Sequence, residues 1–441
     1  MGQLLGSPPA ESRPHDAPRS FELKVVEPPP AQPRPRARPE WIAQANWLVG
    51  KKLITEPEAE RLVRSRNLPK DFEERMLARF PAAVACDNVA EVTSDVIIAG
   101  HRDEPVDRPI RTYDGPYPPH LSSGNMRQPA VELYVARRGK IFLGQKQTTL
   151  ILDPSTYYTG LSRPASRWVA PVFADSPGEI KLRGTAAILF SNGASHFSHW
   201  MFDLLPRIEV LRRAGWGDSR IDYYVVNAFR TNYQKETIDR LGIPHRKIVV
   251  ASTTTVSADR LLIPTDVRVN FRTPPWISEF VRPLFLPKAA AHRRSAPRRL
   301  HISRARARYR HIINQDQIDP ILQKFGFETV FAEERTIAEC AALACDAGEI
   351  FAPHGAGAVN VVFGSPGIRL LESFSAHIAP EGWLLTQSLG GQHYIMAGHD
   401  RDGRFPWEGA YDGFSERERN HADYLVRPED MERALELLTA R

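Results

Sequence analysis

The sequence has no long hydrophobic run. Although 42% of its 441 residues are hydrophobic, no segment approaches the roughly 20 consecutive apolar residues that span a bilayer. The first residues, MGQLLGSPPAESRPHD, also lack the charged start and the continuous apolar core of a secretory signal. We therefore expect a cytoplasmic protein that does not cross a membrane.

Cysteine is scarce as well. Cys86, Cys340 and Cys345 are too few and too unevenly spaced for a disulfide framework. Cys340 and Cys345 fall in the apolar run TIAECAALACDA, which is typical of small buried residues on a helix. No second Cys or His pair stands at the spacing of a zinc site. We expect no bound metal and a reducing compartment.

The positive charge of the chain is concentrated in one stretch. The net charge is +6, and eight arginines but no acidic residues lie between Arg293 and Arg310. Such a run could hold nucleic acid, an anionic membrane surface or a phosphorylated small molecule. Peripheral association with a membrane is therefore one of the expectations.

The N-terminal part is read as an arm followed by a small extension. Residues 1–40 are rich in Pro, Arg and Ala, which predicts a disordered or extended arm. Residues 41–120 form a helical and β extension, because Trp41–Asn67 has helical periodicity with a turn near Gly50. Further on, the Arg138–Gly139 pair separates the strand-like runs VELYVA and KIFLG and predicts a hairpin.

Two later segments alternate short apolar runs with amphipathic helices, which is the pattern of parallel α/β units. The first contains strands at 186–191, 222–227 and 247–252, and the second begins at Arg299. A stretch rich in Pro and Arg, 271–297, is expected to link them. The predicted fold is α/β, with two Rossmann-like lobes facing a cleft: an N-terminal lobe over 121–280 and a C-terminal lobe over 281–441.

A glycine turn in FAPHGAGAVNVVF is the strongest local motif. A buried strand runs into His354, Gly355, Ala356 and Gly357 before a short helix starts. Glycines let backbone approach a ligand closely, and a helix N-terminus offers free N–H groups to a phosphate. His354 would donate to a diphosphate, or the motif is only a tight turn. Glu372, after the next strand, could hold ribose or sugar hydroxyls.

The segment HISRARARYRHIIN adds positive charge near the same sheet edge. Ser303 and Arg304 come directly after a predicted strand, and Arg308 and Arg310 follow. Arginines in this position can meet a leaving phosphate with bidentate hydrogen bonds. The alternative is that each arginine is a solvated surface charge.

A histidine and aspartate set lies in the first α/β segment. His196, His199 and Asp203 share one face of a predicted helix. A histidine supported by a carboxylate suits a general base. The same residues could instead ligate zinc or form a structural pair.

Three blocks of residues occur together and in one order. They are H-x-x-H-W-x-x-D-L-L-P-R from His196 to Arg207, I-S-R at 302–304 leading to Ile313-Asn314, and A-P-H-G-A-G at 352–357 with Asn360 and P-G-x-x-x-L-E ending at Glu372. This combination resembles glycosyltransferase family 61, which includes bacterial capsule-type proteins, plant xylosyl- and arabinosyltransferases and animal O-linked N-acetylglucosaminyltransferases. The similarity covers about residues 185–400.

The resemblance implies an inverting, metal-independent transfer of a hexose or pentose from a nucleotide sugar in a GT-B-like fold. The nucleotide is expected to be UDP, and the acceptor a glycan or lipid-linked glycan in capsular or extracellular polysaccharide synthesis. His199, Asp203 or His196 would act in catalysis. The donor would bind at Ser303, Arg304, Arg310, His354, Gly355, Ala356, Gly357, Asn360 and Glu372. Gln315, His311 and His196 depart from residues common in the family.

A different class of function uses the same basic run. The chain could be a non-enzymatic protein that binds nucleic acid or another anion through Arg293–Arg310. Aromatic residues that stack on bases are missing from this run apart from Tyr309. We therefore expect no nucleic-acid partner.

Overall fold

The computed structural model describes fourteen stretches or single positions of the chain. They are residues 39–50, 52–65, 69, 71, 84–85, 95–98, 111–112, 131–143, 148–151, 156–158, 178–191, 193–268, 271–286 and 297–440. Contacts divide the chain into two compact units, Met1–Arg38 and Pro39–Arg441. The expected disordered arm lies outside the described residues, except for its last two positions, which begin the first helix.

The predicted helical pair is present. Helix α1 (Pro39–Gly50) and helix α2 (Glu56–Ser65) pack through buried residues that include Leu48 and Leu62. Helix α2 starts at a capping box, because the Thr55 N–H donates to Glu58 Oε2 at 2.8 Å while the Glu58 N–H donates to Thr55 Oγ1.

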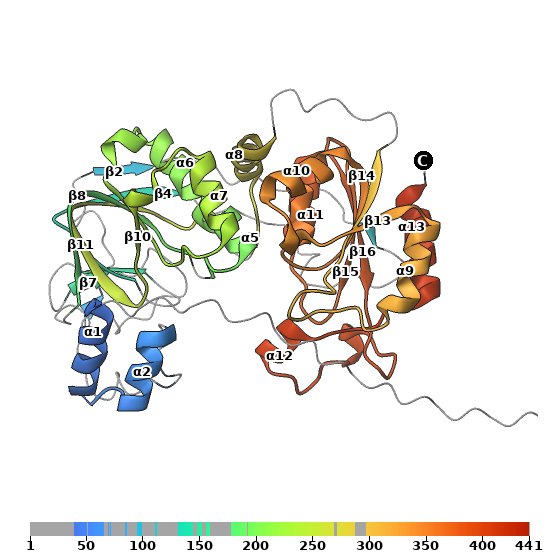
Figure 1. Cartoon of the computed structure of the whole chain (residues 1–441), viewed down its shortest axis with the longest axis horizontal. Coiled ribbons are helices and arrows are strands. Elements are labelled where there is room, and N and C mark those ends of the chain that lie inside the picture. The colour runs from blue at the N-terminus through green and yellow to red at the C-terminus, as the bar shows by residue number, and fades with distance from the viewer. Residues whose placement is uncertain are drawn as a thin grey trace, which may run out of the picture. The chain divides into compact units, whose positions relative to one another are not determined.

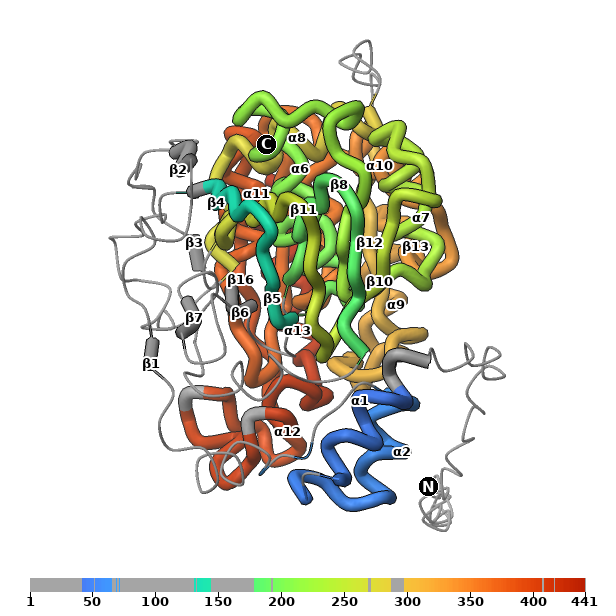
Figure 2. The backbone as a smooth tube through the Cα atoms, turned by 90° about the vertical axis from the view of Figure 1, so that its left-hand side faces the viewer, coloured from blue at the N-terminus to red at the C-terminus, as the bar shows by residue number. Residues whose placement is uncertain are grey.

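The first sheet combines a parallel set with antiparallel neighbours. Its strands are β1 (Val84–Ala85), β2 (Asp95–Ile98), β4 (Glu132–Arg137), β5 (Lys140–Leu143), β6 (Thr148–Ile151), β7 (Thr156–Tyr158), β8 (Ile180–Leu189), β9 (Tyr223–Val226), β10 (Ile248–Val250) and β11 (Thr254–Pro264). The order β10-β9-β8-β11 is parallel throughout. Figure 2 shows β8 and β11 running next to each other, with β5 beyond β11. The alternation predicted this parallel set, but β11 itself was not foreseen.

The predicted hairpin at Arg138–Gly139 is wrong. Strands β4 and β5 do not pair with each other; both pair antiparallel with β11, one after the other along its length. Arg138 has φ +50° and its N–H donates to Asp259 O at 2.8 Å. A Cβ on Gly139 would lie 2.9 Å from Leu261 Cδ1, so this position has room only for glycine. The two residues interrupt one long strand as a bulge and do not reverse the chain.

The helices of the first sheet follow its parallel strands. After β8 the chain forms the short helix α5 (Phe197–His199), a π-helical turn (Trp200–Leu204) and α6 (Pro206–Arg213). The π turn is closed by the bond from the Leu205 N–H to Trp200 O at 3.0 Å, five residues apart. Helix α7 (Asn232–Arg240) follows β9. Trp200 is fully buried and donates to Thr237 Oγ1 of α7 at 2.8 Å, which ties this segment to the rest of the layer.

The second sheet is parallel, as predicted. Its strands are β12 (Arg298–Ile302), β13 (Phe327–Val330), β14 (Ala347–Pro353), β15 (Arg369–Phe374) and β16 (Gln392–Ala397), in the order β13-β12-β14-β15-β16, with β3 (Arg111–Thr112) at the outer edge. Its helices are α9 (Gln315–Lys324), α10 (Ile337–Asp346), the 3-10 helix η6 (Ala358–Phe363), α11 (Glu381–Ser388), α12 (Glu416–His421) and α13 (Pro428–Thr439).

Helices cover both faces of the second sheet, as Figure 1 shows, with α10 and α11 on one side and α9 and α13 on the other. The buried strand residues alternate accordingly. Ile350 and Ala352 pack into the core with α10, whereas Phe351 packs with α9 and α13. A run of seven buried residues in β14 is typical of a strand that is covered on both faces.

The stretch 271–297 is more than a linker. It contains helix α8 (Pro275–Phe285), whose Trp276, Ile277 and Val281 are buried in the same core as residues of both sheets. Arg282 donates to the carbonyls of Val362 and Gly364 in the second α/β set. The prolines of this stretch suggested a linker. Pro275, however, lies in the first turn of α8, where its missing N–H removes no helical hydrogen bond. Two separate parallel-rich sheets are therefore joined by a buried helix.

None of the helices in the described part of the chain is both long and apolar enough to span a membrane.

Candidate active site

The second sheet has a topological switch point between β12 and β14. Its parallel strands follow the order of doubly wound sheets, in which ligands bind beyond the carboxyl ends of the strands where the order reverses. Ser303 and Arg304 follow β12, and His354 and Gly355 follow β14. Gly355 has φ +140°, and a Cβ there would lie 2.5 Å from Arg304 Nη1. The structure thus brings the predicted arginine and the glycine turn together.

Two arginines at this point have no acidic partner. Within the described residues neither Arg304 nor Arg310 forms an ion pair, and Arg310 Nε is buried with no hydrogen-bond partner. Burial lowers the pKa of Arg304, and burial together with the charge of Arg304 lowers that of Arg310 to about 10. Arg304 Nη2 donates only to the Tyr309 carbonyl, at 3.0 Å. Two neighbouring cations without a counter-ion form a site for an anion.

His354 is held by a buried carboxylate. Its Nδ1 lies 2.6 Å from Glu372 Oε1, and His393 Nε2 lies 2.9 Å from Glu372 Oε2. Burial alone would raise the pKa of Glu372, but the two histidines outweigh burial and hold it at about 2. The His354 ring also stacks on Phe374, with centroids 4.7 Å apart. Nε2 of His354 is therefore the ring nitrogen left for a ligand.

The other predicted donor residues lie around the same turn. Asn360 Nδ2 donates to Gly357 O at 2.9 Å, and Asn360 Oδ1 is buried without a hydrogen-bond partner in the described part of the chain. Ser303 Oγ accepts from the Ala305 N–H at 3.1 Å. Glu372 does not meet the expectation of a contact with sugar or ribose, since it is 1% exposed and both of its oxygens serve histidines.

The histidine and aspartate set of the first sheet forms a dyad. His199 Nδ1 lies 2.5 Å from Asp203 Oδ2. Burial alone would raise the pKa of Asp203, but the charge of Arg268 and the bond to His199 outweigh burial and hold the pKa below its usual range. An ionised carboxylate can only accept, so Nδ1 carries the hydrogen and Nε2 has a free lone pair. Gly193 makes room for the ring, because a Cβ there would lie 2.7 Å from His199 Cδ2.

The third predicted catalytic residue, His196, lies beside the dyad. Its Nδ1 is 3.2 Å from Gly193 O, and its ring centroid is 6.2 Å from that of His199. Burial, reinforced by the proximity of His199, lowers the pKa of His196. His196 is therefore a neutral neighbour of His199 near pH 7.

A line of rings connects the dyad with the glycine turn. Phe271 lies 5.4 Å from His199 and 6.2 Å from His377, and His377 lies 5.2 Å from His354, measured between ring centroids. Burial and the nearby charge of His354 lower the pKa of His377 to about 3, so this ring is neutral.

Sequence reasoning missed several members of the site, namely Arg268, Phe271, His377, Glu381 and His393. Each stands alone in a loop or at the end of an element, outside any spaced motif. The only sequence signal was that Arg268, Phe271, His377 and Glu381 come within a few residues of a strand end, whereas His393 lies at the start of β16.

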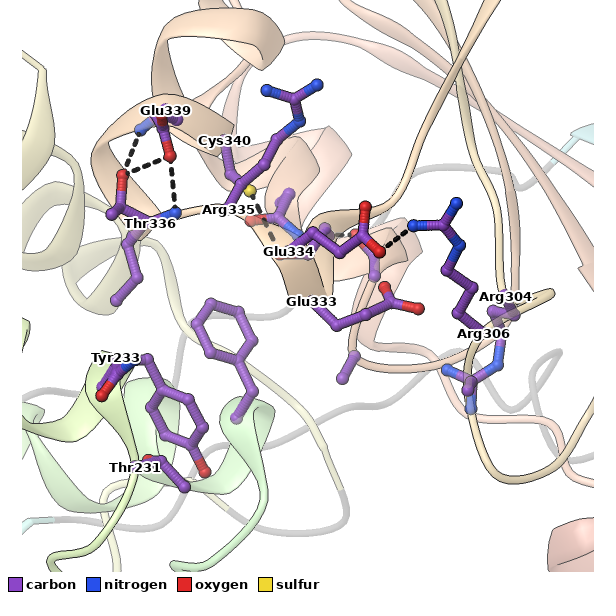
Figure 3. Close-up of a pocket in the computed structure, with 18 of the residues that line it drawn as sticks. Thr231, Tyr233, Arg304, Arg306, Glu333, Glu334, Arg335, Thr336, Glu339 and Cys340 are labelled. Carbon is purple, nitrogen blue, oxygen red and sulfur yellow. Dashed lines mark hydrogen bonds and ion pairs between the residues drawn. The ribbon is translucent and has the colours of Figure 1, made fainter. Parts of the chain in front are cut away.

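A cavity of about 640 Å³ opens beside the arginines. Its walls come from both α/β sets: the start of α7 with Thr231 and Tyr233, the loop after β12 with Arg304 and Arg306, and the loop after β13 with Glu333, as Figure 3 shows. Its size falls within the roughly 300–1,000 Å³ that is common for pockets of small molecules.

Three other arginines of the basic run lie close to acidic residues. Arg298 pairs with Glu328 at 3.1 Å, Arg299 lies 3.7 Å from Glu349, and Arg306 pairs with Glu334. Arg293 and Arg294 lie outside the described residues. Among the described residues, no three His, Cys, Asp or Glu side chains gather as metal ligands.

Two parallel-rich sheets, two neighbouring arginines without an ion-pair partner in the described residues and a histidine–carboxylate dyad are consistent with an α/β enzyme. The family model described as Glycosyltransferase 61 matches residues 197–371, which include His199, Asp203, Arg304 and His354. This match supports membership of glycosyltransferase family 61. No curated protein matches it.

Proposed function

We propose that the chain transfers a sugar, with inversion, from a nucleotide diphosphate sugar to a hydroxyl group of an acceptor. The observation that carries this proposal is the pair Arg304 and Arg310, two neighbouring cations that form no ion pair with a carboxylate in the described residues; Arg304 also lines the cavity. A diphosphate supplies the missing negative charge, and the cavity has the size for the attached nucleoside.

In this mechanism His199 is the base. Its Nε2 takes the proton of the acceptor hydroxyl as that oxygen forms a bond to the anomeric carbon of the donor. The bond from this carbon to the diphosphate oxygen breaks, and the electron pair leaves with the diphosphate. Asp203 holds the His199 tautomer and stabilises the imidazolium that forms.

The leaving group meets positive charge. Arg304, Arg310 and His354 would surround the developing phosphate charge, as preorganised donors do in other group transfers. Glu372 keeps His354 in place. Because arginines and histidine provide the charge, the proposed transfer needs no metal ion.

Several finer points belong to the same proposal. The two parallel-rich sheets with a cavity between their loops suit a GT-B-like enzyme, and UDP is the nucleotide that we expect. The sugar is a hexose or pentose, and the acceptor is a glycan or lipid-linked glycan of capsular or extracellular polysaccharide. A cytoplasmic site of action is part of the same proposal. Peripheral contact with a membrane would bring the enzyme to a lipid-linked acceptor.

A thermal-shift panel tests this function. The purified full chain is heated with UDP, GDP, CDP, ADP and UMP, with their common sugar conjugates, and separately with duplex DNA. One nucleoside diphosphate at 100 times its Kd should stabilise the fold by about 2.7 kcal/mol, and the monophosphate by clearly less. If every nucleotide leaves Tm unchanged while DNA raises it in a salt-dependent way, the chain is an anion-binding protein and the transferase proposal fails.

A further inference from the structure

Arg268 joins the base dyad to the second α/β set. It lies just after β11, and its side chain is 1% exposed. Its Nε donates to Asp203 Oδ1, and its Nη1 donates to Glu381 Oε1 and, at 2.8 Å, to Thr273 Oγ1. One buried guanidinium is thus shared by two carboxylates from opposite halves of the enzyme.

Glu381 reaches this point from the first turn of α11. Its side chain is 6% exposed, and both of its oxygens accept from Ser198 Oγ, at 2.7 and 2.8 Å. Ser198 directly precedes His199. Glu381 lies beyond residue 371, where the family match ends.

The same helix turn also contacts the carboxylate behind His354. A Cβ on Gly382 would lie 2.3 Å from Glu372 Oε2, so α11 approaches Glu372 as closely as glycine allows. The start of α11 therefore supplies one carboxylate, Glu381, that supports the base dyad through Arg268. It also packs against a second carboxylate, Glu372, that supports the anion site. One turn of α11 thus links the residues that support the base dyad to those that support the anion site.

The charges of this cluster add up to one net negative charge. Arg268 balances only one of Asp203 and Glu381, and the proton that His199 accepts during transfer makes the whole set neutral. The titratable and charged groups that face His199 are Asp203 and His196 on its own segment, Arg268 after β11, and His377 beyond Phe271, with Arg310 and His354 behind it. Because Arg268 pairs with Glu381 as well, it does not fully neutralise the negative charge of Asp203.

We propose that Glu381 is a positioning residue for transfer, which acts through Arg268 to set the orientation and the proton affinity of the His199–Asp203 dyad. The catalytic part of this inference rests on the proposed function, whereas the electrostatic part concerns the chain alone. A merely structural ion pair would hold the halves together without changing how His199 takes up a proton.

The direct test is an NMR titration of the histidine rings. The full chain is labelled with ¹³C at histidine Cε1, and the His199 signal is identified by its loss in His199→Gln. In Glu381→Gln the midpoint of the His199 titration should fall by about one pH unit, because the negative charge that competes with Asp203 for Arg268 is removed. A midpoint within about 0.2 units of wild type in the folded variant overturns the electrostatic coupling, whatever the chain transfers.

Kinetics test the catalytic part. UDP release is measured with UDP-N-acetylglucosamine, UDP-xylose and UDP-glucose. In Glu381→Gln, kcat should fall about 3- to 10-fold with unchanged KM for the donor, and the acid limb of the kcat profile should move to lower pH. If wild type itself releases no UDP and binds no nucleotide, the proposed function fails, while the NMR result still decides the coupling.

Two further variants complete the design. Glu381→Asp keeps the charge but shortens the reach to Arg268, so kcat should fall while the His199 midpoint stays near wild type. It also carries the test if Glu381→Gln does not fold, and wild-type kcat in this variant contradicts the positioning role. Glu209→Gln is the matched control, because Glu209 also pairs with an arginine, Arg213 at 2.7 Å, but does not contact Arg268. Glu209→Gln should leave both kcat and the midpoint of the His199 titration unchanged.

Discussion

The two sheets place an arginine at the same kind of position but surround it differently. In the first sheet the parallel order reverses between β8 and β11, and the loops after these strands carry His199 and Arg268. In the second sheet it reverses between β12 and β14, and the loops carry Arg304 and His354. Arg268 is enclosed by two carboxylates, whereas Arg304 has no acidic partner among the described residues.

This difference separates two uses of buried positive charge. A guanidinium between carboxylates is already satisfied, and its value lies in holding those carboxylates in place. A guanidinium beside another cation, as in Arg304 and Arg310, is stabilised when an anion arrives. The fold offers the same edge position twice, and the acidic neighbours decide whether it supports a base or binds a ligand.

Removing the base should have the largest effect on turnover. His199→Ala should lower kcat by about 10²–10⁴-fold, since it deletes the group that takes the acceptor proton, and Asp203→Asn should lower it somewhat less. Nucleotide affinity should stay nearly constant in both variants, because the proposed contacts with the diphosphate lie on the other sheet. Steady-state rates and isothermal titration with UDP measure the two quantities. Full activity in both variants would move the base to His196, and a loss of UDP binding with folding intact would break the division of labour between the sheets.

Removing the unpaired arginine should show the opposite pattern. Arg304→Ala should lose roughly 2–4 kcal/mol of transition-state stabilisation and should also weaken UDP binding. Arg298→Ala is the matched control from the same basic run, because Arg298 already pairs with Glu328 at 3.1 Å. Comparing kcat/KM and UDP affinity for the two variants sharpens the contrast between paired and unpaired charge. Equal small losses in both would show that pairing does not distinguish the arginines.

The carboxylate of the anion site should affect stability in a pH-dependent way. The pKa of Glu372 is held at about 2, below the ordinary value of 4.5. Its ionised form therefore contributes stability at pH values above about 4.5, and this contribution is lost as the pH falls from 4.5 toward 2. Glu372→Gln should be less stable by about 2–3 kcal/mol at pH 7.

Urea unfolding at pH 7, 5.5, 4 and 3 follows this effect. The difference in the free energy of unfolding between wild type and Glu372→Gln should become smaller below pH 4.5. Glu432→Gln, which breaks an exposed pair with Lys324, should leave stability nearly unchanged at every pH. A gap that stays constant down to pH 3 would show that the carboxyl is not ionised against the two histidines.

Much of the second sheet could be predicted because its signals are local. Strand β14 contains the apolar run Ile350–Pro353, and the glycine turn follows it directly, so the position of His354 came from neighbouring residues alone. Ser303 and Arg304 were placed at the same edge for the same reason. The spacing of His199 and Asp203 likewise predicted a dyad on one helical face.

The missed features depend on contacts that are distant in the sequence. Glu381 meets Arg268 across 113 positions, and no spacing rule connects them. In the sequence, β4 and β5 look like the two strands of a hairpin. Only their pairing with the same strand, β11, shows that β5 runs in the same direction as β4. Glu372 looked available for a sugar, but His393, which takes its second oxygen, comes from the next strand. The role of each residue in the site remains a prediction until the variants are measured.

The π turn at Trp200–Leu204 gives the catalytic segment one residue more than a regular helix would need. Each residue of an α-helix turns the next by about 100°, so a shortened segment would rotate everything after it relative to everything before it. His199 stands before the extra residue, and Arg207, which donates to Pro264 O at 2.5 Å and to Asp266 Oδ1 at 2.6 Å, stands after it. His199 and Arg207 can both keep their positions only when the segment between them has this length. A single-residue deletion here would therefore rotate Arg207 and its contacts relative to His199.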